Sequence, residues 1–268
     1  MLAENQLPQN FLDWNAQQGA PYGKPIILAK KLKRWLPSTW YWSLRGPFSV
    51  QRNNTTRAFE YPWAFFQAQV SPGDRILEVG GSLSGFQFAL AQHGCRVVNI
   101  DPGFEAAGKG WHCDQDTLAK LNRLFHTDVE LRNTTIEKAE LPSDAFDCAF
   151  SISVIEHLPW GDVENVMRET FRSLKPGGRF ILTVDLFTDV APFQTAQTNK
   201  YGANINIKEL AAVENFELVF GEKTQLYGYT EFEPQRILTD RDRFLVGGGY
   251  PAMVQCLVLK KPEKETEY

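Results

Sequence analysis

The sequence has few of the residues that build metal centres and disulfide frameworks. Its 268 residues include four histidines, and its four cysteines, Cys95, Cys113, Cys148 and Cys256, are scattered without a C-x-x-C pair. Such spacing predicts neither a zinc site nor a disulfide network, and unpaired cysteines suit a reducing compartment. We therefore expect a cytoplasmic chain without a bound metal.

Long apolar runs and an excess of basic residues are also missing. No apolar run approaches the ~20 residues that cross a bilayer, and residues 1–14 lack the basic start and apolar core of a secretory signal. A formal net charge of -4 and an isoelectric point near 5.7 argue against a nucleic acid as the main partner. These absences favour a soluble chain that acts on a small molecule. The length of 268 residues suits one large α/β domain with additions, or at most two domains.

The most informative stretch present is residues 74–102. It begins with a buried strand at Ile76–Val79, which is followed by a glycine turn at Gly80-Gly81. A helix at Phe86–Leu90 comes next. A second strand at Arg96–Ile100 then ends on the acid of Asp101-Pro102. This order predicts one βαβ unit of a nucleotide-binding parallel sheet.

The glycine turn helps to separate two kinds of ligand. A dinucleotide places its pyrophosphate on the helix N-terminus, and the second glycine of G-x-G-x-x-G lets the backbone approach it. Here that spacing gives Gly80, Ser82 and Gly85, so the second glycine is a serine. The carboxylate of Glu78, two residues before the turn, would repel a phosphate and would suit a cationic ligand, such as one with an amino group and a sulfonium.

A second stretch, residues 145–185, continues the alternation of strands and helices. Residues 145–158, AFDCAFSISVIEHL, predict a strand that ends near Glu156-His157. The next helix has apolar residues at a 3.6-residue period and stops at a Lys-Pro-Gly-Gly turn, residues 175–178. Arg179–Asp185 then predicts a fifth strand.

Both stretches resemble one family. Residues 78–85, EVGGSLSG, resemble motif I of the class I S-adenosylmethionine (SAM)-dependent methyltransferases, although Ser82 and Ser84 replace two glycines of its G-x-G-x-G. Residues 146–158 resemble the family's fourth strand, F-D-x-x-x-S-x-x-V-x-E-H-L. The resemblance covers residues 74–185 and points to the small-molecule methyltransferases. It implies a three-layer, Rossmann-like α/β fold with a seven-stranded sheet, mostly parallel with an antiparallel C-terminal strand, and SAM as the cofactor.

The resemblance also implies roles for individual residues. Glu78 would face the methionyl end of SAM, Asp101 would accept the ribose hydroxyls, and Glu137 with the Lys138 backbone would bind adenine. Tyr61, near Arg57 and Glu60, would either approach the cofactor carboxylate or belong to an aromatic helix that covers the sheet. The predicted cofactor-binding set is Glu78, Gly80, Gly81, Ser82, Gly85, Asp101, Pro102, Glu137, Lys138, Ser151, Ser153 and Tyr61.

His157 and Asp185 are the candidates for catalysis. An imidazole exchanges protons near neutral pH, as a hydroxyl acceptor would require of a general base. An equal alternative is that Glu156-His157 only turns the chain into the next helix. Asp185 would stand at the end of the fifth strand, on the rim that faces the acceptor, as a base, as a hydroxyl-binding group or as a solvated strand end.

The regions before and after residues 74–185 are not covered by the resemblance. Residues 1–56 predict an N-terminal region, with a polar arm over 1–23 and a basic amphipathic helix over Pro25–Leu36 followed by Trp40–Trp42. This helix is interpreted as a packed surface helix, as a lid over the substrate or as a weak membrane-surface contact. Residues 57–261 predict the SAM-binding domain, with a loop insertion around 221–250, and residues 262–268 a mobile tail.

Three functions remain open at this point. The first is a SAM-dependent methyltransferase that produces S-adenosylhomocysteine and methylates an oxygen or nitrogen of a small acceptor. Sugar-containing compounds and secondary metabolites are included among the acceptors by analogy with relatives. The second is a catalytically silent SAM-binding module that acts through its basic aromatic N-terminal helix. The third, a nucleotide-linked oxidoreductase, is disfavoured by Glu78 and Ser82. The oligomeric state is left open.

Overall fold

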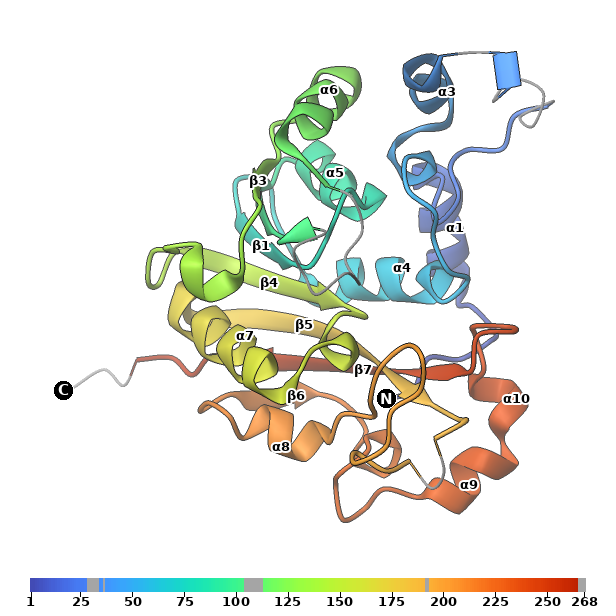
Figure 1. Ribbon diagram of the computed structural model, residues 1–268, viewed down its shortest axis with the longest axis vertical. Coiled ribbons are helices and arrows are strands. Elements are labelled where there is room, and N and C mark those ends of the chain that lie inside the picture. The colour runs from blue at the N-terminus through green and yellow to red at the C-terminus, as the bar shows by residue number, and fades with distance from the viewer. Residues whose placement is uncertain (28–33, 36, 104–112, 191–192, 265–268) are drawn as a thin grey trace.

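The protein is organised around a seven-stranded sheet. The computed structural model describes residues 1–27, 34–35, 37–103, 113–190 and 193–264 (Figure 1). Within them the strand order is β3-β2-β1-β4-β5-β7-β6. The strands are β1 Arg75–Val79, β2 Arg96–Ile100, β3 Glu130–Arg132, β4 Phe146–Ile152, β5 Leu174–Phe187, β6 Glu217–Phe220 and β7 Ala252–Lys260. β7 is antiparallel to both β5 and β6, and the other pairs are parallel, so the predicted fold class is confirmed.

Helices cover both faces of this sheet because its central strands are apolar on both sides. Ile76 and Phe150 point into one core and their neighbours Leu77 and Ala149 into the other, as the two-residue period of a strand requires. The first core is covered by α1 Gln9–Gln18, η1 Pro47–Ser49, α4 Arg57–Ala68, α5 Gly85–Gln92 and α6 Gln115–Phe125. The second is covered by η3 Ile136–Lys138, η4 Ile155–His157, α7 Trp160–Ser173 and α8 Ile207–Ala211.

The interpretation of residues 1–23 as a polar arm is wrong. Leu2 and Ala3 are completely buried, and the Ala3 amide donates to the Val254 carbonyl of β7 at 2.8 Å. α1 buries Phe11 and Trp14, whose spacing places both rings on one helix face. The predicted helix Pro25–Leu36 lies largely outside the described residues, and Trp40–Trp42 belong to α3 Ser38–Arg45.

The C-terminal insertion is more ordered than a loop. It contains η5 Lys223–Gln225, α9 Pro234–Thr239 and α10 Arg241–Phe244, and Ile237 and Phe244 join a small core with Leu2 and Met253. The fifth strand begins at Leu174, before the Lys-Pro-Gly-Gly turn. No helix in the described ranges has the length and apolar content needed to cross a membrane.

Candidate active site

The chemically useful side chains gather where the parallel strands end. β1 lies between β2 and β4, so the chain order reverses there, and the carboxyl ends of these strands face the same edge. This edge receives the turn after β1, Asp101 after β2, the segment 153–157 after β4 and Asp185 near the end of β5. The topology therefore brings together four of the predicted segments.

The turn after β1 is held by bonds within the protein. Gly80 has a φ of +72°, and a Cβ there would lie 2.7 Å from Val154 Cγ1, so only glycine fits. Every backbone N–H from residue 80 to residue 84 has an acceptor: Ile100 O, Asn99 Oδ1, Asp101 Oδ2, Gln51 Oε1 and Gly81 O, in chain order. These donors are already used, so the turn does not offer the N–H cradle that a pyrophosphate needs.

Glu78 is the most unusual carboxyl group at this turn. It is 2% exposed, its Oε1 accepts a 3.1 Å bond from Ser84 Oγ, and its Oε2 has no hydrogen-bond partner in the described part of the chain. Burial raises the pKa of this carboxyl to about 8. Ser84, which stands in place of a motif glycine, thus holds one carboxylate oxygen of Glu78 by a hydrogen bond. The other oxygen, Oε2, is left for a cationic or hydrogen-bonding ligand.

Asp101 is positioned to accept further hydrogen bonds. Its Oδ2 accepts from the Ser82 amide at 2.8 Å and its Oδ1 from the Gly103 amide at 2.7 Å. These two bonds fix the carboxylate at the strand end, where it is 7% exposed and precedes Pro102. Each carboxylate oxygen keeps a second lone pair, so the group can take two neighbouring hydroxyls.

The remaining members of the predicted cofactor set are distributed more widely. A Cβ on Gly85 would lie 2.6 Å from the Phe48 ring, so the glycine there permits packing of η1. Tyr61 is 2% exposed, stacks on Phe86 and donates from its hydroxyl to Asn53. Glu137 and Lys138 are exposed on η3, and the buried Ser151 Oγ has no partner among the described residues. Their roles as ligands stay predictions.

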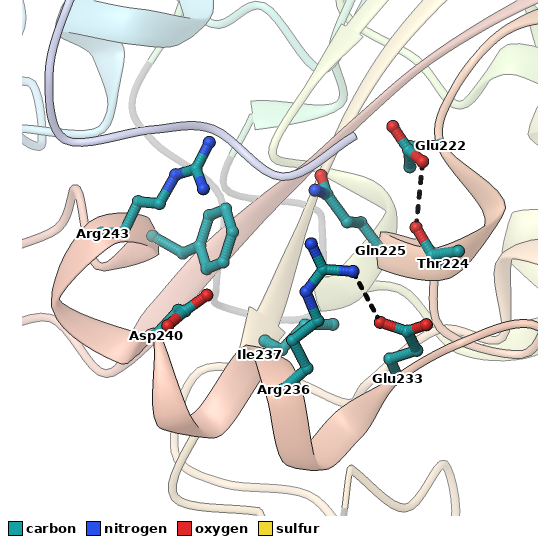
Figure 2. A pocket seen from close by; sticks show the side chains of 9 residues that line it. Glu222, Thr224, Gln225, Glu233, Arg236, Ile237, Asp240 and Arg243 are labelled. Atoms are coloured by element: carbon teal, nitrogen blue, oxygen red, sulfur yellow. Dashed lines mark hydrogen bonds and ion pairs between the residues drawn. The ribbon is translucent and has the colours of Figure 1, made fainter.

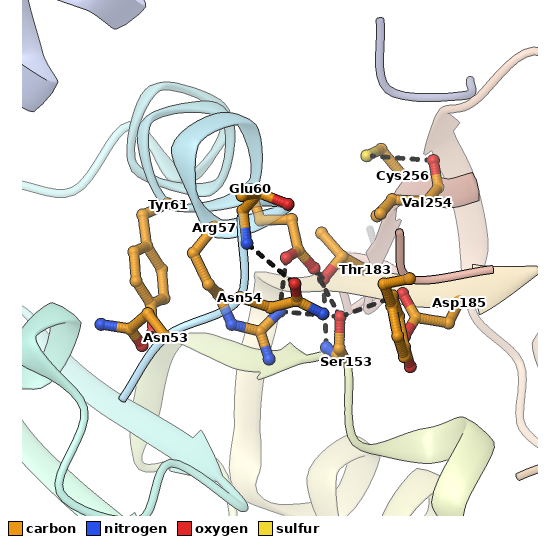
Figure 3. Close-up of polar contacts among 12 residues, drawn as sticks. Asn53, Asn54, Arg57, Glu60, Tyr61, Ser153, Thr183, Asp185, Val254 and Cys256 are labelled. Carbon is orange, nitrogen blue, oxygen red and sulfur yellow. Dashed lines mark hydrogen bonds and ion pairs between the residues drawn. The ribbon is translucent and has the colours of Figure 1, made fainter. Parts of the chain in front are cut away.

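A buried polar cluster joins α4 to the ends of β4 and β5 (Figure 3). Arg57 pairs with Glu60 and donates to Ser153 Oγ at 2.8 Å, while Thr183 Oγ1 donates to Glu60 Oε1 at 2.6 Å. Glu60 is completely buried, and Arg57 holds the pKa of its carboxyl below the ordinary value despite the burial. Thr183 was missed by sequence reasoning, although a hydroxyl within an apolar strand could have marked it.

A second acidic group adjoins this cluster. Asp185 is 2% exposed, so it is neither a rim residue nor a solvated strand end, and Tyr250 donates to its Oδ2 at 2.6 Å. Burial, together with Glu156 and Glu60, raises the pKa of Asp185 well above its ordinary value. Burial likewise raises the pKa of Glu156 to about 7. Tyr250 was not expected from the sequence.

His157 is oriented by the backbone of a distant loop. Its Nδ1 lies 2.7 Å from the carbonyl oxygen of Tyr201, which can only accept, so Nδ1 carries the proton in the neutral ring. Nε2 then presents a lone pair, 4.0 Å from Glu156 Oε1. The side chain is 36% exposed, so this nitrogen is able to exchange a proton with a neighbouring molecule.

A separate cavity lies in the C-terminal insertion (Figure 2). It has a volume of about 100 Å³ and is lined mainly by charged residues, among them Glu222, Glu233 and Arg236. Arg236 donates to Glu233 and Thr224 donates to Glu222. Ligand pockets usually enclose roughly 300–1,000 Å³, so this cavity is too small to serve as an acceptor pocket. Within the described residues, no group of three or more His, Cys, Asp or Glu side chains could hold a metal ion.

The buried carboxyl groups make stability depend on pH. Because the folded-state pKa values of Glu78 and Glu156 are raised, the folded chain holds more protons than the unfolded chain above about pH 4.5. As the pH rises from about 5 to about 8, the free energy of unfolding is therefore expected to fall by about 3–4 kcal/mol through Glu78 and by about 2–3 kcal/mol through Glu156. The free energy of unfolding is measured by urea unfolding at several pH values in this range. It should depend less steeply on pH in Glu78→Gln than in the wild type, and as steeply as in the wild type in the exposed-site control Glu137→Gln. If the free energy of unfolding depended on pH equally in the wild type and in Glu78→Gln, the raised pKa of Glu78 would be contradicted.

Known proteins resemble the chain at the level of family and fold. Residues 77–182 match the family of methyltransferase domains. The ubiquinone biosynthesis O-methyltransferase of Pseudomonas entomophila (strain L48) is 33% identical over 116 residues, which are 42% of this chain and 45% of that protein. The chain thus spans about half the length of this curated relative.

Solved structures extend the similarity beyond that stretch. The [4+2]-cyclase SpnF superposes with a TM-score of 0.55 and 16% identity, over 90% of this chain and 99% of that chain. An S-adenosylmethionine-dependent methyltransferase from Mesorhizobium loti superposes with a TM-score of 0.50 and 17% identity, over 75% of this chain and 97% of that chain. At these identities the likeness establishes the fold.

Proposed function

We propose that the chain transfers a methyl group from SAM to a small molecule, because residues 77–182 match the family of methyltransferase domains and the sheet has the fold of a solved SAM-dependent methyltransferase. The observation that carries this proposal is the turn after β1. Its N–H groups are bonded within the protein, while a buried oxygen of Glu78 is left without a partner among the described residues.

The residues at this edge suit SAM in charge and in hydrogen-bonding capacity. The free oxygen of Glu78 would accept from the ammonium group, and Asp101 would take the two ribose hydroxyls. When bound, SAM supplies a methyl group that its sulfonium already makes electrophilic. The protein then has to hold the acceptor atom in line with that methyl group, and such alignment can contribute several kcal/mol to the rate.

The proton of the acceptor would leave through His157. The bond from Nδ1 to the Tyr201 carbonyl sets the tautomer in which Nε2 accepts a proton. The nearby Glu156 carboxylate would stabilise the imidazolium that results. Tyr250, whose hydroxyl is held by the buried Asp185, would bind a polar group of the acceptor. The methylated group would be a hydroxyl or an amine, whose proton His157 takes. Sugar-containing and secondary-metabolite acceptors are part of this proposal.

The proposal is tested by titrating the protein calorimetrically with S-adenosylhomocysteine and, separately, with NAD. Binding of the first ligand alone is expected. Transfer of labelled methyl groups is then measured on phenols, sugars and amines, with His157→Gln beside the wild type. This change is expected to lower the rate about 100-fold or more while the affinity for S-adenosylhomocysteine stays the same. Binding of NAD instead would contradict the proposal. Tight binding of S-adenosylhomocysteine without transfer to any acceptor would favour the catalytically silent SAM-binding module.

A further inference from the structure

The most exposed large apolar side chains lie in one part of the sequence. Ile27, Trp35, Trp40 and Leu44 are 89%, 81%, 66% and 53% exposed, more than any other large hydrophobic residue in the described ranges. We call these four side chains the N-terminal apolar surface. In Figure 1, α3 and the short segment at residues 34–35 stand at the same end of the molecule, away from the C-terminal insertion.

Trp40 and Leu44 are exposed because the opposite side of α3 is attached to the rest of the protein. On its inner side Tyr41 is 7% exposed, and Arg45 Nη1 donates to the Tyr41 hydroxyl at 2.5 Å. Arg45 also donates to the carbonyls of Tyr22 and Lys24, at 2.7 and 3.0 Å, which ties the preceding loop to the helix. Residues four apart share a helix face, so Trp40 and Leu44 point together to the outside.

The charge of this region is opposite to that of the rest of the chain. Residues 14–59 contain eight lysines and arginines and no aspartate or glutamate, whereas the whole chain has a formal net charge of -4. Lys24 and Arg34 are exposed beside the apolar side chains. Tryptophans flanked by basic residues suit the headgroup layer of a bilayer, because the indole ring meets both apolar and polar groups and the cations meet anionic lipid.

We propose that the N-terminal apolar surface docks on a bilayer that carries anionic headgroups. Ile27, Trp35, Trp40 and Leu44 enter the headgroup layer, and Lys24 and Arg34 lie against lipid phosphates. Docking is reversible and superficial, because a few side chains and a few cations contribute to it. It uses none of the residues at the carboxyl ends of the strands and is therefore independent of the proposed methyl transfer.

The experiment is co-sedimentation of the full chain with phosphatidylcholine vesicles, with and without phosphatidylglycerol. Binding is expected only to the anionic vesicles, and it should weaken as ionic strength rises from about 0.1 M to about 0.5 M. Trp35→Ser/Trp40→Ser should weaken the partition into anionic vesicles about tenfold or more. Lys24→Gln/Arg34→Gln should weaken it about thirtyfold, at about 1 kcal/mol per charge.

The matched control removes two exposed apolar side chains elsewhere. Val219 and Leu238 are 48% and 40% exposed, and Val219→Ser/Leu238→Ser should sediment like the wild type. Thermal unfolding of each variant confirms that it is folded. Absence of wild-type binding to anionic vesicles, or equal binding of the tryptophan variant, would overturn the proposal. So would a dimer in sedimentation equilibrium that the tryptophan variant abolishes while vesicle binding is absent, because the surface would then pair two copies of the chain.

Discussion

Replacement of Asp101 by alanine is expected to weaken the binding of S-adenosylhomocysteine about 100-fold or more. The carboxylate would accept both ribose hydroxyls, and a hydrogen bond to a charged group contributes about 1.5–3 kcal/mol. The same change removes the acceptor of the Ser82 and Gly103 amides, so the turn after β1 loses one of its bonds to the segment at the end of β2. Both effects lower the affinity for S-adenosylhomocysteine.

Calorimetric titration separates this effect from a general loss of structure. Asp116→Ala serves as the control, because Asp116 is an exposed acid on α6. Its affinity for S-adenosylhomocysteine should equal that of the wild type. Thermal unfolding without ligand shows how far Asp101→Ala destabilises the fold itself. Unchanged affinity in a folded Asp101→Ala protein would remove Asp101 from the cofactor site.

The largest effect on stability is expected from Arg57→Met. Glu60 is completely buried, and the Arg57 guanidinium is the cation that balances it. Removing one partner of a buried ion pair leaves an uncompensated charge and costs about 3–5 kcal/mol. Urea unfolding at neutral pH should show this loss. The loss should shrink as the pH falls, because Glu60 without Arg57 can become neutral by taking up a proton.

Two further variants test that explanation. Arg57→Met/Glu60→Gln removes both charges and keeps a side chain that reaches Ser153 and Thr183, so it should recover most of the lost stability. Arg168→Met breaks the exposed pair with Glu164 and should change the free energy of unfolding by less than about 1 kcal/mol. If the double variant is as unstable as Arg57→Met, lost packing and not an unpaired charge explains the effect.

The turn after β1 was predictable because its signals are local. An apolar run, two glycines, a helix and an acid follow one another within residues 74–102, and the structure places β1, α5, β2 and Asp101 there. The same holds for β4 and the segment that ends at His157. In parallel sheets, strand order and connection length place such segments at one edge, so their neighbourhood follows from the pattern.

The surroundings of Asp185 could not be predicted in this way. Glu60, Ser153, Thr183 and Tyr250 come from four distant parts of the chain and meet only when α4 and the insertion close over β4 and β5. The interpretation of residues 1–23 failed for a similar reason. Leu2 is buried by a strand more than 250 residues away, and nothing near it in the sequence signals that contact.

The order of the strands and helices in residues 74–185, the glycine turn after the first strand and the acids on both sides of that turn followed from the amino-acid sequence alone. These features depend on residue spacing, side-chain size and backbone freedom, which are local properties. The burial of the carboxyl groups, the free oxygen of Glu78 and the nitrogen of His157 that accepts a proton became apparent in the folded chain alone. Desolvation and hydrogen bonding depend on every element packed around a group, and chain folding brings those elements together from distant positions.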